Sequence, residues 1–124
     1  MRKRRILIVD DEKGFTEMLR LNLEDTLEYE VRTENDSPKA LAAARAFKPD
    51  IIFLDIIMPG MDGGAVLGKL REDVETRDIP VVFLTAIVGE NEADSLKAGI
   101  SGYPVLSKPV SFSKLTECIK KTLR

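Results

Sequence analysis

Residues 51–63, IIFLDIIMPGMDG, decide the fold because they place an acidic residue, Asp55, directly after a continuous apolar run. A short apolar run without polar alternation is typical of a strand that is covered on both faces, as in a parallel sheet. In an open parallel sheet, ligands bind beyond the carboxyl ends of the strands. The stretch therefore predicts a buried parallel strand that ends in a candidate functional carboxylate.

Four segments outside this stretch predict the remaining strands of the sheet. Apolar runs begin at Ile6 and at Val81, and a shorter run lies near Tyr103 to Leu106. The segment from Tyr29 to Thr33 alternates apolar and charged residues, which indicates an edge strand with one face in water.

Segments with helical periodicity follow these strands, and the second is predicted to start at the capping pair Ser37-Pro38. Ser111 is the predicted cap of the last helix, and a fourth helix is predicted over about residues 90–98. The predicted core-facing residues are Phe15, Met18, Leu19 and Leu23, then Ala40, Leu41, Ala44 and Phe47, then Val66, Leu67 and Leu70, and finally Phe112, Leu115, Ile119 and Leu123. Together the segments predict one α/β domain over residues 1–124. We expect a flavodoxin-like, doubly wound (βα)5 sandwich with a five-stranded parallel sheet in the order 2-1-3-4-5.

The composition narrows the classes of function. The 124 residues are 44% hydrophobic and 32% charged with a net charge of −2, which favours a globular domain without bulk attraction to nucleic acid or membrane. The basic start Arg2–Arg5 fits a solvated strand lead-in better than a nucleic-acid arm. No signal peptide or membrane-spanning run is visible, and the lone Cys118, predicted to pack in the last helix, suits a reducing, cytoplasmic compartment. The absence of histidine excludes a histidine ligand, base or phosphoryl carrier within the chain.

Polar residues follow each of the apolar runs. They are Asp10, Asp11 and Glu12, then Asp55, Thr85 and Lys108. Because the carboxyl ends of parallel strands share one edge of the sheet, we expect these side chains to meet there. Crowded carboxylates favour a hard cation such as Mg²⁺, and a carboxylate beside it can attack phosphorus while Lys108 and Thr85 contact the phosphoryl oxygens. Taken singly, the acids could be helix caps, Thr85 an ordinary strand end and Lys108 a surface charge, but their joint occurrence favours a phosphoryl site.

Four segments together resemble the receiver domain of response regulators, and the resemblance runs from Arg5 to Leu123. They are Ile8–Glu12, Phe53–Gly63, Phe83–Ala86 and Ser107–Pro109. The resemblance implies that Asp55 is the phosphoacceptor, that Lys108 pairs with the phosphoryl group, and that Thr85 moves toward it. It also implies Mg²⁺ (or Mn²⁺) bound by Asp11, Asp55 and the Ile57 carbonyl, with Asp10 acting through water. The Lys108–Pro109 bond is expected to be cis.

The same resemblance implies partners. The phosphodonor would be a sensor histidine kinase or a phosphotransfer protein. The readout would lie on the fourth helix, fifth strand and fifth helix, which would face a downstream effector or output domain and could form a homodimer. The domain itself is expected to perform only self-directed phosphoryl transfer and autodephosphorylation, and no direct binding of nucleic acid or membrane is expected.

The sequence departs from the family pattern at two places. Val105 stands where the family commonly has a switch aromatic, while Tyr103 lies two positions earlier. The positions two past Asp55 and two past Thr85 are Ile57 and Ile87, and neither apolar side chain can orient an attacking water, so we expect slow autodephosphorylation. Two alternatives remain: a phosphorylation-independent interaction module, which Val105 keeps open, and a Mg²⁺-dependent phosphohydrolase, which the apolar Ile57 disfavours.

Overall fold

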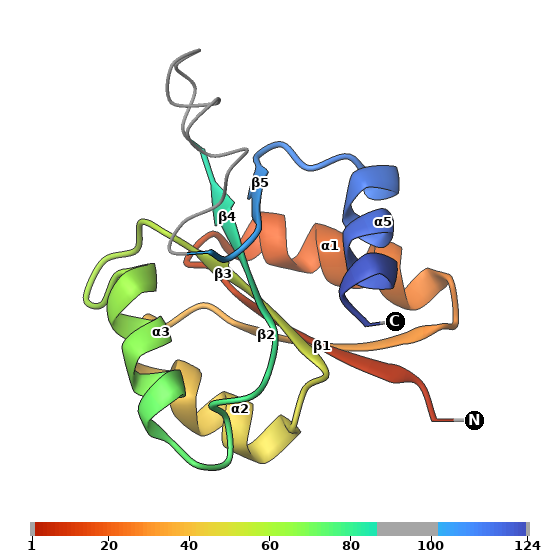
Figure 1. Ribbon diagram of the computed structural model, residues 1–124. Coiled ribbons are helices and arrows are strands. Elements are labelled where there is room, and N and C mark those ends of the chain that lie inside the picture. The colour runs from red at the N-terminus through yellow and green to blue at the C-terminus, as the bar shows by residue number, and fades with distance from the viewer. Residues whose placement is uncertain (1, 87–101, 124) are drawn as a thin grey trace.

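The structure is a computed structural model that describes residues 2–86 and 102–123. Strands and helices alternate over residues 4–85, and a further strand and helix lie within residues 105–122 (Figure 1). The strands are β1 (Arg4–Val9), β2 (Tyr29–Glu34), β3 (Ile51–Asp55), β4 (Val81–Thr85) and β5 (Val105–Ser107). The helices are α1 (Lys13–Asp25), the 3₁₀ turn η1 (Ser37–Lys39), α2 (Ala40–Phe47), α3 (Gly63–Glu72) and α5 (Phe112–Thr122). The fourth helix expected at residues 90–98, and Ile87, lie outside the described residues.

The strands form one parallel sheet in the order β2-β1-β3-β4-β5. In its register Ile8 lies beside Phe53, Leu54 beside Phe83, and Thr85 beside Ser107. The predicted flavodoxin-like topology is therefore confirmed, and β2 is an edge strand as its alternating pattern indicated. Because all the strands run the same way, the residues that follow them gather at one edge.

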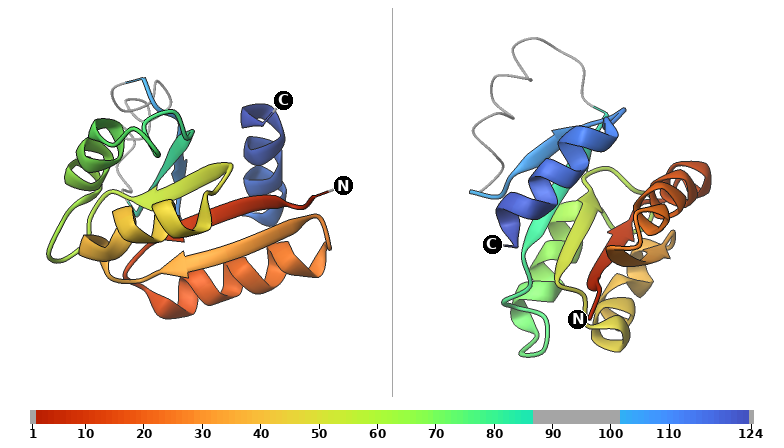
Figure 2. Two further views of the ribbon diagram at one scale, coloured as in Figure 1. Left: turned by 90° about the horizontal axis from the view of Figure 1, so that it is seen from below. Right: turned by 90° about the vertical axis from the view of Figure 1, so that its right-hand side faces the viewer.

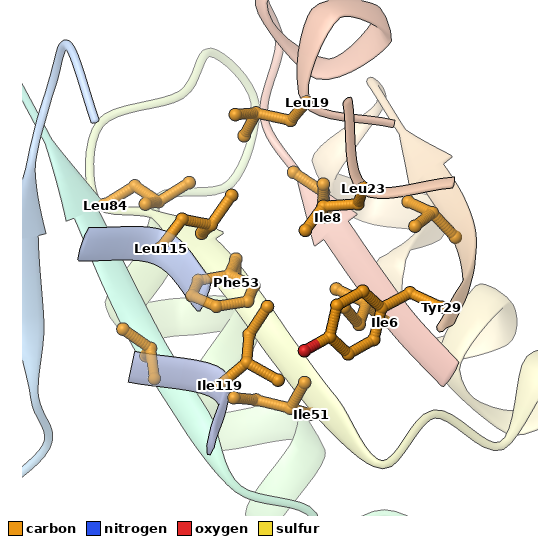
Figure 3. Packing of buried hydrophobic residues seen from close by; sticks show 12 residues of the cluster. Ile6, Ile8, Leu19, Leu23, Tyr29, Ile51, Phe53, Leu84, Leu115 and Ile119 are labelled. Atoms are coloured by element: carbon orange, nitrogen blue, oxygen red, sulfur yellow. The ribbon is translucent and has the colours of Figure 1, made fainter. Parts of the chain in front are cut away.

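Helices cover both faces of the sheet, with α1 and α5 on one face and α2 and α3 on the other (Figure 2). Alternate residues of each central strand serve the two cores: Ile6 and Ile8 enter the first, and Leu7 and Val9 enter the second. Phe53 lies fully buried in the middle of the first core, beside Leu115 and Ile119 of α5 (Figure 3). Burial on both faces explains why the central runs carry no polar alternation.

The prediction that Met18 faces the core was wrong. Met18 is 47% exposed, and Thr16 is buried in α1 instead. At about 100° per residue, the buried arc of α1 runs from Phe15 through Leu19 and Leu23 to Thr16, and Met18 lies outside it. The period was right, but the direction of the arc depends on how the helix sits on the sheet.

Two predictions at the starts of other helices were wrong, those for Ser37 and Phe112. Ser37 is not a cap, because it lies within η1 and its hydroxyl bridges the loop at Pro59 and Met61. Phe112 is 43% exposed at the first position of α5 and lines a surface hollow with the end of α1 instead of entering the core. The predicted cap Ser111 is confirmed, since its hydroxyl accepts a hydrogen bond from the Lys114 amide at 3.2 Å.

Cys118 packs half-buried against the first core, as predicted. Its burial raises the pKa of the thiol, which disfavours the reactive thiolate. Among the described helices, none combines the length and the apolar character that crossing a membrane requires.

Candidate functional site

Three polar residues end or follow the central strands at the carboxyl edge of the sheet. Asp10 follows β1, Asp55 ends β3 and Thr85 ends β4, and all three are at least 95% removed from solvent, with exposed fractions of 0%, 5% and 1%. Buried carboxylates are unfavourable unless they meet a cation or hydrogen-bond donors. Their concentration at one edge therefore indicates a built site.

The two buried aspartates form a cluster with Asp11, which is exposed at the rim. One carboxylate oxygen from each of the three lies within 4.8 Å of the others. An all-oxygen set of this kind, open to water on one side, suits Mg²⁺, which keeps several water ligands. Ile57 lies beside it with a 71% exposed side chain, and its amide donates to Asp55 Oδ1 at 3.4 Å. The donor chemistry and burial thus fit a divalent cation.

Lys108 supplies the positive charge from the end of β5. Its Nζ lies 2.5 Å from Asp10 Oδ2, 3.0 Å from Glu12 Oε1 and 3.4 Å from Asp55 Oδ2, and its side chain is only 10% exposed. Its amide donates to the Thr85 carbonyl at 2.7 Å, which fixes the strand end beside β4. The Lys108–Pro109 peptide bond is cis, as the resemblance implies.

The electrostatics of the site follow from this crowding. Burial, and next the charge of Asp10, raise the pKa of Asp55 to about 6, although Lys108 acts in the opposite direction. Burial works to lower the pKa of Lys108, but the hydrogen bonds and charges of Asp10, Glu12 and Asp55 outweigh it and raise that pKa. Lys108 is therefore a cation at neutral pH. Its single positive charge is smaller than the negative charge that the three carboxylates of the acid cluster can carry, which favours binding of a further cation.

The alternative readings of single residues are not what the structure shows. Asp10 does not cap α1: its Oδ1 accepts from the Glu12 amide at 2.9 Å, ahead of the helix, and the N-terminal capping position is Glu12 itself. Lys108 is not a solvated surface charge, because its ammonium group is enclosed by three carboxylates. An open hollow of about 430 Å³ is lined by Asp11, Glu12, Asp55, Ile57, Ala86 and Lys108.

The sequence analysis missed two supporting roles, those of Asn35 and Ser37. The Asn35 amide donates to the Asp10 carbonyl at 2.8 Å and to the Thr16 hydroxyl at 2.9 Å, which ties the acid pair to α1 and to the end of β2. Ser37 fixes the loop after Asp55, accepting from the Met61 amide at 3.1 Å and donating to the Pro59 carbonyl at 3.0 Å. Asn35 directly follows the second strand, so the strand-end rule applied to that strand would have found it.

Comparison with known proteins agrees with this geometry. The family model described as the response regulator receiver domain matches residues 6–120. The chain belongs to this family. A receiver domain is a signalling module rather than a true enzyme, and it implies a histidine kinase as partner in general. The acidic pocket of Asp10, Asp11 and Asp55 is consistent with the metal site typical of receivers.

Both longer proteins and a single-domain structure are similar to this chain. Response regulator PleD of Caulobacter vibrioides is 47% identical over 108 residues, which are 86% of this chain and 23% of PleD. The phosphate regulon transcriptional regulatory protein PhoB of Pseudomonas aeruginosa is 38% identical over 120 residues, 96% of this chain and 51% of PhoB. The solved structure of chemotaxis protein CheY4 of Vibrio cholerae has a TM-score of 0.83 at 28% identity, covering 98% of this chain and 100% of CheY4. The receiver thus spans about half or less of the two curated relatives.

Val105 and Tyr103 both lie next to Phe83 of β4. Val105 pairs with Phe83 in the sheet, and Tyr103 meets the Phe83 ring edge-on at 6.0 Å between centroids. The Tyr103 hydroxyl accepts a hydrogen bond from Arg71 Nε at 2.8 Å, and the Arg71 guanidinium lies 5.2 Å from the ring centroid. Tyr103 is therefore fastened to the end of α3, so it packs as a structural anchor of β5.

Proposed function

We propose that residues 1–124 form a single receiver domain in which Asp55 accepts a phosphoryl group from a phosphohistidine of a sensor histidine kinase or phosphotransfer protein. The observation that carries this proposal is the position of Asp55, which clusters with Asp10 and Asp11 and lies 3.4 Å from the ammonium group of Lys108. A carboxylate that lies beside both an ammonium group and an acid cluster suited to a metal ion is arranged for attack on phosphorus.

The transfer needs no general base, because an ionised carboxylate has no proton to lose before it attacks phosphorus. A carboxylate oxygen of Asp55 forms the new O–P bond, the P–N bond to the donor histidine breaks, and the imidazole leaves with that electron pair. Mg²⁺ (or Mn²⁺), held by Asp11, Asp55 and the Ile57 carbonyl with Asp10 acting through water, would neutralise charge on the phosphoryl oxygens. Lys108 would pair with one phosphoryl oxygen, and the Thr85 hydroxyl would donate a hydrogen bond to another.

Asp55→Asn is expected to abolish phosphoryl uptake, because the amide is not a nucleophile. The purified chain would be incubated with acetyl phosphate and Mg²⁺ and its intact mass measured. We expect one added phosphoryl group that EDTA and Asp55→Asn both prevent. Asp78→Asn is the matched control, since Asp78 is exposed and precedes β4 at the opposite edge of the sheet. Uptake that persists in Asp55→Asn would contradict the assignment.

The phosphorylated form is expected to persist for minutes or longer. Ile57 is 71% exposed beside the site, and its apolar side chain cannot orient a water for in-line attack. The side chain at position 87 is also apolar and has no hydrogen-bonding group. Decay of the phosphorylated mass after removal of acetyl phosphate would measure the lifetime. Ile57→Asn should shorten it several-fold by offering a hydrogen-bond partner to water. Loss of the label within seconds in the unaltered chain would refute the expectation.

Phosphorylation at Asp55 is proposed to shift a two-state balance that is read at β5, α5 and residues 90–98. The partner there would be a downstream effector or an output domain, and the same face could form a homodimer. Transcriptional regulatory proteins among the relatives support an output domain. We further propose a cytoplasmic location, where a kinase would present its phosphohistidine.

One observation favours a second candidate, a phosphorylation-independent interaction module. Arg71 holds Tyr103 in place, and Val105 has no aromatic ring that could move when Thr85 moves. Neither residue is therefore placed to couple a movement of the Thr85 hydroxyl to a movement of an aromatic side chain. Asp55→Asn separates the two candidates. In a phosphorylation-independent module the substitution should leave partner binding unchanged, whereas in a switch it should abolish the effect of acetyl phosphate on partner binding.

A further inference from the structure

The ring of Phe15 lies against the ammonium group of Lys108. The distance from Lys108 Nζ to the ring centroid is 4.7 Å, within the range of about 6 Å over which a cation is attracted by the face of an aromatic ring. Phe15 belongs to the first turn of α1, and Lys108 follows β5, so the contact joins two elements that are far apart in the chain.

The ring is held in place by the core beneath it. Phe15, Leu19 and Leu23 recur at every fourth position of α1 and form its stripe against the sheet. Leu19 and Leu23 are buried, whereas Phe15 is half-buried at the end of the stripe nearest the site. Phe15 therefore has one side packed on the first core and presents its face to Lys108.

The contacts of Lys108 differ in what happens to them during the reaction. Its carboxylate contacts are Asp10, Glu12 and Asp55, and two of these belong to the acid cluster. A carboxylate that binds a metal cation, or that forms an acyl phosphate, attracts an ammonium group less strongly. The attraction of the ring arises from its own quadrupole, so it is unaffected by the charge on the acids.

Resting on the proposed function, we propose that Phe15 is a positioning residue, whose ring keeps the Lys108 ammonium group at the phosphoryl site when the carboxylates are engaged. An apolar side chain that merely fills the same space would not do so. The role thus requires an aromatic face at position 15, and it is separable from the contribution of Phe15 to the core.

The contact itself is tested in the metal-free protein by NMR. Protons of the Lys108 side chain near Nζ, over a ring face, are expected to resonate upfield of those of exposed lysines such as Lys121. Phe15→Leu should remove this ring-current shift and Phe15→Tyr should retain it. An unshifted Lys108 in the unaltered chain would overturn the proposal, whatever the phosphorylation result.

The positioning role is tested by the rate of uptake from acetyl phosphate at saturating Mg²⁺. We expect Phe15→Leu to be about three- to tenfold slower, Phe15→Tyr to be near the unaltered rate, and the exposed Phe112→Leu to be unchanged. Thermal melting of each variant checks folding, and Phe15→Met replaces the leucine variant if that one does not fold. Equal rates for Phe15→Leu and the unaltered chain would overturn the proposal alone, whereas no uptake by the unaltered chain would contradict the proposed function.

Discussion

Replacing Gly63 by alanine is expected to lower the free energy of unfolding by about 3 kcal/mol or more. A Cβ at Gly63 would lie 2.5 Å from the carbonyl oxygen of Asp55 and 2.9 Å from the Cα of Ile56. Both neighbours are backbone, so no side-chain rotation relieves the overlap. The Gly63 amide also donates to the Ile56 carbonyl at 2.8 Å, which holds α3 close to the end of β3. The displaced segment carries Asp55, the proposed phosphoacceptor, so phosphoryl uptake should fall together with stability.

Gly68 provides the matched control on the same helix. A Cβ at that position meets nothing within 4 Å, so Gly68→Ala should gain up to about 1 kcal/mol from helix propensity. Urea unfolding followed by circular dichroism would measure both variants. A Gly63→Ala protein with the midpoint of the unaltered chain would show that the start of α3 can move away from β3 at little cost.

The strands and the members of the site could be predicted because they depend on local pattern and on one topological rule. Runs such as Ile51–Leu54 have no polar face, which fixes a buried parallel strand, and parallel strands bring their ends together. Asp55 and Lys108 were placed at one edge by that rule, without knowledge of any distance.

The rest depended on contacts between elements, which periodicity does not encode. Ser37 has the sequence signature of a helix cap but bonds to the loop after Asp55. Tyr103 could be identified as an aromatic out of place, but its fastening to Arg71 depends on how α3 ends beside β5. Phe15 was predicted as a core residue, and only the structure shows that its outer face meets Lys108.

The metal-free Asp55→Asn protein is expected to be more stable than the unaltered chain at pH 7.5, by about 3 kcal/mol. The pKa of Asp55 is about 6 in the folded protein against 3.8 for an unperturbed aspartate, because burial and Asp10 disfavour its charge. At roughly 1.4 kcal/mol per pH unit, that difference sets the magnitude. Lys108 keeps its ion pairs with Asp10 and Glu12 in the variant, so it is not left as an isolated buried cation.

The pH dependence of this difference identifies its cause. Below about pH 3 Asp55 is protonated in both the folded and the unfolded chain, so the variant should have almost no electrostatic advantage there. As the pH rises from about 4 to about 6, Asp55 loses its proton in the unfolded chain but keeps it in the folded protein, so the unaltered chain loses stability. The difference in the free energy of unfolding between Asp55→Asn and the unaltered chain should therefore grow over this range and stay constant above it. Urea unfolding in EDTA at several pH values would trace it, with exposed Asp78→Asn expected to follow the unaltered chain. Added Mg²⁺ should then stabilise the unaltered chain more than Asp55→Asn, because the variant lacks one of the three carboxylates of the acid cluster. A gap that keeps its full size at pH 3 would instead mean that the substitution improves packing and that the charge of Asp55 does not destabilise the folded protein.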